Sequence, residues 1–124
     1  MGKAKISESQ IQQGIVGLLS SLSRQNNFAF FSVPNERLLK GLTKKQAIIR
    51  IQHLKKMGMI PGCSDLVIVH KEIAYFVEVK TPTGKQSDNQ HNFMIWVNAC
   101  GCPYVIVRSP ADMIRALKGW EIVR

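Results

Sequence analysis

The stretch PGCSDLVIVHKEIAYFVEVK, residues 61–80, decides the fold of this chain. It contains two apolar runs rich in β-branched residues, at 66–69 and 73–79, and the polar pair Lys71–Glu72 lies between them. Two such runs separated by a short polar turn predict a β-hairpin, although no glycine is present to specify the turn type.

Two acidic residues of this hairpin are expected to face each other. With a two-residue turn, His70 pairs with Ile73, and counting outward along the strands places Asp65 directly across from Glu78. Opposed residues have Cβ atoms about 4.5–5.5 Å apart, where like charges repel. Strand alternation adds Lys80 to the face that carries Glu78. A divalent cation between the carboxylates would turn their repulsion into coordination, so the hairpin predicts a metal site.

The same residues match a known signature. Pro-Gly-x-x-Asp, twelve intervening residues and then Glu-Val-Lys, all within residues 61–80, resembles the signature of the PD-(D/E)xK nucleases. The VRR-Nuc branch of that superfamily is named for a Val-Arg-Arg that reads Val107-Arg108-Ser109 here, so the second arginine is missing. The segments that resemble this branch span roughly residues 8–117, and besides the hairpin they are 33–35, 54–58, 81–90 and 105–108.

The order of predicted elements indicates an α/β fold formed by one domain, residues 1–124. At 124 residues the chain has the length of a single domain. The expected architecture is a central mixed β-sheet flanked by helices, which is also the nuclease-like core that the resemblance implies. Capping boxes and apolar periodicity place helices at 8–23, 44–57, 88–100 and 110–117, and strands at 28–33, 66–70, 73–79 and 103–107.

The resemblance implies which residues bind the metal. Asp65 and Glu78 are expected to hold Mg²⁺, for which Mn²⁺ should substitute, and no small-molecule cofactor is expected. The Val79 carbonyl and Glu8 are further ligands by resemblance. Glu8 precedes Ile11 by three residues and therefore shares the apolar face of the first helix. The alternative for Glu8 is an acid that complements the helix macrodipole.

Two more residues are expected to take part in catalysis. Lys80 can orient the attacking water or stabilise charge in the transition state. Gln90 precedes Phe93 by three residues, so its amide should point toward the sheet and the carboxylates. The alternative for Gln90 is a capping role alone, together with Ser87.

The charge of the chain favours a polyanionic partner. The net charge is +9, and residues 37–64 contain seven Lys and Arg but no acidic residue. Such a field suits nucleic acid first and acidic membranes second. A helix at 44–57 would present most of these cations opposite a core face of Ala47, Ile48, Ile51 and Leu54, although a merely solvated face is the alternative. The residues expected to bind nucleic acid are Asn35, Arg37, Lys40, Lys44, Lys45 and Lys85.

The resemblance also implies a substrate and a quaternary structure. By this resemblance, the chain is expected to form a homodimer that resolves four-way (Holliday) DNA junctions, as short members of the family look to do. Flaps, nicked duplex or RNA as substrates, and a DNA-binding module without catalysis, remain alternatives. Apolar residues after the last helix, Trp120, Ile122 and Val123, are candidates for the dimer interface or else for the monomer core. Without a long apolar stretch or a signal peptide, the protein is expected in the cytoplasm of a bacterial or phage-infected cell.

Overall fold

The structure, a computed structural model, describes residues 5–34 and 39–124. Asn35 and Arg37, two of the residues expected to bind nucleic acid, lie outside the described residues. No helix in these two ranges is long and apolar enough to span a membrane. The elements follow the predicted order and are α1 (Glu8–Leu22), β1 (Ala29–Ser32), α2 (Lys44–Lys56), β2 (Leu66–His70), β3 (Ile73–Val79), α3 (Asp88–Ala99), β4 (Tyr104–Val107) and α4 (Pro110–Gly119).

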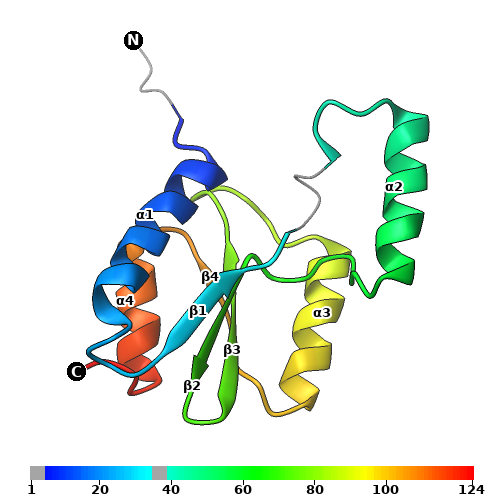
Figure 1. The fold of residues 1–124 in the computed structure, drawn as a ribbon. Coiled ribbons are helices and arrows are strands. Elements are labelled where there is room, and N and C mark those ends of the chain that lie inside the picture. Colours follow the sequence, from blue (N-terminus) through cyan, green and yellow to red (C-terminus); the bar gives the residue numbers. More distant parts are fainter. Residues whose placement is uncertain (1–4, 35–38) are drawn as a thin grey trace.

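A mixed four-stranded sheet forms the centre of the fold, which confirms the predicted α/β architecture. Its strand order is β1-β2-β3-β4, with antiparallel pairing except between β3 and β4, which are parallel. Helices α1 and α4 lie against one face and α3 lies on the other (Figure 1). The main core fills the space between the sheet and helices α1 and α4. Its fully buried members include Ile15, Leu19, Leu66, Ile68, Val77, Met113 and Leu117.

The hairpin has the register that its sequence predicts. His70 pairs with Ile73 and Leu66 pairs with Val77, so the next opposed positions are Asp65 and Glu78. Both turn residues have positive φ, 48° and 71°, as a type I′ turn requires. The twist of that turn suits the flanking strands, which explains how a hairpin without glycine closes in two residues.

Helix boundaries were predicted well because the capping signals are local. The three predicted capping boxes, which begin at Ser7, Thr43 and Ser87, are all formed. In each box the hydroxyl accepts from the backbone N–H three residues later, and the glutamine there accepts from the backbone of the capping residue.

The predicted core face of α2 is wrong. None of its residues is buried, and the side chain of Ile48 is 49% exposed. Figure 1 shows α2 at the side of the molecule, away from the helices that cover the sheet. An apolar stripe shows which face of a helix avoids water, but it does not show that another element covers that face.

The residues after α4 pack on the monomer core, which is the alternative that the sequence left open beside a dimer interface. Ile122 is buried, and Val123 packs against the core cluster. The ring of Trp120 contacts that of Tyr75, with centroids 4.6 Å apart. The chain therefore folds back after Gly119 and closes one end of the core.

The loop that leads into β2 is held by a Pro-Gly turn. Cys63 donates its backbone N–H to the carbonyl of Ile60, at 3.1 Å, and Gly62 between them has a φ of +79°. Pro at the second position and Gly at the third are the residues of a type II turn. A Cβ on Gly62 would lie 2.3 Å from the carbonyl carbon of Asn89, so this turn packs directly on the first turn of α3.

Substituting Gly62 should therefore destabilise the protein more than an ordinary glycine change. Gly62→Ala combines positive φ with a clash against backbone, and we expect a loss of about 2–5 kcal/mol in the free energy of unfolding. Gly58→Ala is the matched control, since Gly58 has a φ of +101° but open space around it. Urea unfolding measures both variants. Equal losses would contradict the close packing of the turn on α3.

Candidate active site

Asp65 and Glu78 lie side by side at the end of the hairpin, and both are buried, with exposures of 4% and 2%. Asp65 immediately precedes β2, and one of its carboxylate oxygens accepts a hydrogen bond from the backbone N–H of Val79, at 2.8 Å. By strand alternation Glu78 shares a face with Phe76, whose ring contacts Phe93 of α3. The acidic pair therefore lies on the face of the sheet that α3 covers.

Gln90 contacts the acidic pair and also caps its own helix. Its Nε2 donates to Oε1 of Glu78 at 2.6 Å, while its Oε1 accepts the backbone N–H of Ser87 at 2.8 Å. The expected contact with the carboxylates and the helix cap are thus both present, so Gln90 does more than cap its helix. Because the cap fixes one end of the amide, the other end is held toward the carboxylate.

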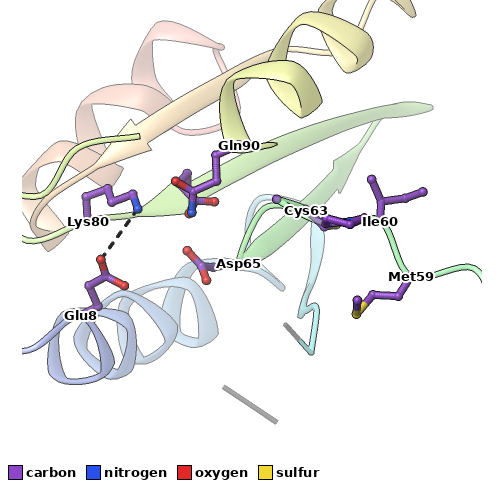
Figure 2. Close-up of a pocket in the computed structure, with 10 residues that line it drawn as sticks. Glu8, Met59, Ile60, Cys63, Asp65, Lys80 and Gln90 are labelled. Atoms are coloured by element: carbon purple, nitrogen blue, oxygen red, sulfur yellow. Dashed lines mark hydrogen bonds and ion pairs between the residues drawn. The ribbon is translucent and has the colours of Figure 1, made fainter. Parts of the chain in front are cut away.

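Lys80 and Glu8 meet beside the pair. The Lys80 side chain is almost fully buried, and its Nζ lies 4.0 Å from Oε1 of Glu8, which projects from the first turn of α1 (Figure 2). Helix α1 thus brings a third carboxylate to the site, as its place on the apolar stripe predicts. In this structure that carboxylate pairs with the lysine.

The electrostatics of the site are dominated by Glu78. Burial, and then the negative charge of Asp65, raise the pKa of Glu78 to about 8, although Lys80 opposes the shift. Its Oε2 is buried and has no hydrogen-bond partner in the described part of the chain. A buried oxygen without a partner is costly, so this atom calls for a proton or a cation.

The oxygen ligands of this site fit a hard divalent cation that needs only one or two protein carboxylates. Mg²⁺ takes one or two carboxylates and fills its remaining positions with water or substrate. Asp65 and Glu78 supply that number, and the unpartnered oxygen of Glu78 is a free donor atom. Within residues 5–34 and 39–124, no group of three or more His, Cys, Asp or Glu side chains is arranged to hold a metal. Glu8 in its present position therefore does not join the pair as a third ligand.

The site opens into a cavity of about 190 Å³ with two different walls. The polar wall carries the five residues that the sequence singled out, Glu8, Asp65, Glu78, Lys80 and Gln90. The opposite wall is the segment 59–63, whose side chains include Met59, Ile60 and Cys63 (Figure 2). Burial raises the pKa of the Cys63 thiol, and so do the neighbouring carboxylates. Pro61 and Gly62 of this wall belong to the signature quoted above, but Met59, Ile60 and Cys63 were missed because no motif assigns them a role.

The described lysines that were expected to bind nucleic acid lie outside this cavity. Lys40, Lys44, Lys45 and Lys85 are all exposed, the middle two in the first turn of α2. None of them lines the cavity. Their positions suit contact with a long polyanion that extends beyond the site, and not with the group that the carboxylates would hold.

Arg108, the arginine of the altered Val-Arg-Arg motif, has a contact that the sequence did not reveal. Its guanidinium donates to the carbonyls of Thr81 and Gly84, at 2.6 and 2.7 Å. These bonds tie the end of β4 to the loop that follows Lys80. The arginine thus fixes the loop between the lysine and α3.

A mixed sheet with an acidic pair and a lysine at the end of its central hairpin defines the class: an α/β protein with a nuclease fold. The family model described as the VRR-NUC domain matches residues 6–111, and the chain therefore belongs to the VRR-NUC domain family. A solved structure described as a VRR_NUC domain protein superposes with a TM-score of 0.67 and 13% identity, over 95% of this chain and 90% of that one. A search of curated proteins gives no match. Family membership implies a nuclease-type function with DNA as its substrate.

The raised pKa of Glu78 predicts how stability depends on pH without metal. Between about pH 4.5 and pH 8 the folded protein keeps a proton that the unfolded chain has lost, so the free energy of unfolding should fall as pH rises through this window. Urea unfolding at about pH 5 and pH 8 in chelator measures this fall. Glu78→Gln should flatten it, whereas Glu72→Gln, at an exposed turn position, should not. An equal slope in all three proteins would contradict the assignment.

Proposed function

We propose that this chain is a Mg²⁺-dependent endonuclease that hydrolyses phosphodiester bonds in DNA, with Asp65 and Glu78 as the residues that hold the ion. The observation that carries the proposal is the buried carboxylate pair beside a cavity that both residues line, with one Glu78 oxygen that has no hydrogen-bond partner in the described residues. Mn²⁺ should replace Mg²⁺ because it accepts the same oxygen ligands. Glu8 and the Val79 carbonyl are proposed as further ligands, which for Glu8 requires release from Lys80.

The chain's own residues support hydrolysis in distinct ways. When bound, Mg²⁺ would supply Lewis acidity toward the phosphate and the attacking water. Gln90 holds one oxygen of Glu78 and leaves the other for the ion. The N–H of Val79 fixes Asp65 in the same way. Lys80, buried beside the pair, supplies positive charge where the phosphate oxygens gain negative charge.

DNA binding is proposed to use exposed cations around the site. Lys40 precedes α2, Lys44 and Lys45 are its first two residues, and Lys85 precedes α3. Such side chains bind the phosphate backbone without reading base sequence. Asn35 and Arg37, which lie outside the described residues, are also proposed to bind nucleic acid. A net charge of +9 supports long-range attraction to DNA.

We further propose that the substrate is a four-way junction and that two copies of the chain act on it in the cytoplasm of a bacterial or phage-infected cell. The resemblance to short VRR-Nuc proteins supports the junction. One chain carries one hairpin site, and a symmetric substrate needs two cuts, which a two-fold dimer provides. Ile122 is buried in the monomer core, so that residue is not proposed for the dimer surface.

Removing one carboxylate should abolish cleavage without abolishing DNA binding. We expect Asp65→Asn and Glu78→Gln each to lower the cleavage rate by about 10²–10³-fold or more, because each variant removes a charged donor. Glu72→Gln is the control at an exposed position of the same hairpin. Gel assays with Mg²⁺ or Mn²⁺ against linear, nicked, flap and four-way DNA measure cleavage and preference. Unchanged rates in both site variants would refute the metal-site assignment.

Reversing the charge at the start of α2 should weaken DNA binding in a salt-dependent way. For Lys44→Glu with Lys45→Glu, we expect the slope of log affinity against log salt to decrease by about two, because each substitution removes one lysine that neutralises a phosphate. Lys71→Glu with Lys118→Glu is a charge-matched control at exposed positions on other elements. Fluorescence anisotropy at several salt concentrations measures the slopes. An equal decrease in the two double variants would show that only net charge matters.

A further inference from the structure

The apolar wall of the cavity consists mainly of Met59 and Ile60. Ile60 is 37% exposed and Met59 is part-buried, and both line the space in front of Asp65 and Glu78. Figure 2 shows them across that space from Glu8, at the side opposite the lysine. Neither a metal nor a phosphate makes use of apolar side chains, so a ligand that contacts Met59 and Ile60 must offer them an apolar surface.

Two ordered turns hold this pair of side chains in place. Before it, the end of α2 forms a Schellman motif, in which Met59 donates its N–H to the carbonyl of Leu54 at 2.9 Å and Gly58 donates to Lys55 at 3.0 Å. After it comes the type II turn that begins at Ile60 and packs on α3. The backbone of the wall is therefore bounded on both sides by hydrogen-bonded turns, and these turns set where Met59 and Ile60 lie.

The charges around the wall indicate what it contacts. Lys55 and Lys56 lie in the last turn of α2, just before the wall, and Lys80 lies across the cavity. Glu8, Asp65 and Glu78 line the same cavity, so an anionic ligand matches the cavity once the proposed cation is bound. Such a ligand would meet the lysines with its negative charge and would need an apolar surface for Met59 and Ile60. In DNA both belong to one nucleotide, whose phosphate is anionic and whose base has a flat apolar face. A cavity of about 190 Å³ has room for part of one nucleotide and not for a duplex.

We propose that Met59 and Ile60 contact the face of a nucleobase that is unstacked from its neighbour beside the phosphate at Asp65 and Glu78. This inference rests on the proposed function and adds a selection step to it. In a continuous duplex both faces of a base are covered by its neighbours, so the contact requires unstacking. At a branch the duplex is discontinuous, so a base there leaves its stack at lower cost, and the wall then takes the place of the neighbour that the base has left. Apolar side chains, methionine and isoleucine among them, act in this way when they insert between base steps.

The contact can be measured without cleavage. A four-way junction carries 2-aminopurine at the branch, and fluorescence is followed as the full-length protein binds in chelator, with anisotropy as the measure of binding. The wild-type protein should raise the fluorescence about twofold or more, because the base leaves its stack. Met59→Ser and Ile60→Ser should lose most of this rise at saturating protein, and Met59→Leu should restore it. Met57→Ser is the matched control. Met57 lies two residues before the wall, is 74% exposed and does not line the cavity.

The outcomes separate this inference from the proposed function. If the wild-type protein cleaves with Mg²⁺ but binding leaves the fluorescence unchanged, the base contact is wrong and the nuclease proposal stands. If fluorescence rises as expected but no DNA is cut with either metal, the contact stands and the catalytic proposal fails. Loss of the rise in Met57→Ser to the same degree as in Ile60→Ser overturns the assignment to the cavity wall. Failure to bind any DNA overturns both proposals.

Discussion

The burial of Asp65 opposite Glu78 is the constraint on which the rest of the site depends. A two-residue turn fixes the register of β2 and β3, and the register places two carboxylates at one end of an otherwise apolar sheet. Without a cation, burial and the negative charge of Asp65 raise the pKa of Glu78 to about 8, which favours the protonated carboxyl near neutral pH. The remaining free oxygen of Glu78 has no partner in the described residues. Such an arrangement lowers stability in isolation, and a bound cation would relieve it.

The surrounding elements hold this arrangement in place. Gly62 allows the loop before β2 to touch the first turn of α3, and that turn carries Gln90 to Glu78. Helix α1 brings Glu8 to Lys80, and Arg108 ties down the loop after that lysine. Residues from separate parts of the chain therefore position the side chains at the end of the β2–β3 hairpin. Preorganisation of this kind is what an electrostatic site requires, because its groups must not rearrange during the reaction.

The sequence predicted the features that short-range rules determine. Strand alternation and turn counting placed Asp65 against Glu78, and capping boxes located three helix starts. Features that depend on distant partners were not predictable in this way. The stripe on α2 gave no sign that Ile48 stays exposed, and the run after Gly119 did not show that Ile122 fills the core. Met59 and Ile60 were missed because an apolar pair becomes part of a site only when the fold sets it opposite charged residues.

Calorimetric titration of the wild-type protein with Mg²⁺ in buffers of different ionisation enthalpy, near pH 7, tests the central claim most directly. If Glu78 holds a proton until the cation arrives, each ion bound should release about one proton, and the release should decline as pH rises above the pKa of about 8. Glu78→Gln should show neither the proton release nor comparable affinity, whereas Glu72→Gln should behave as the wild type. Absence of Mg²⁺ binding, or binding with no proton release near pH 7, would contradict the account of the buried pair as a metal site.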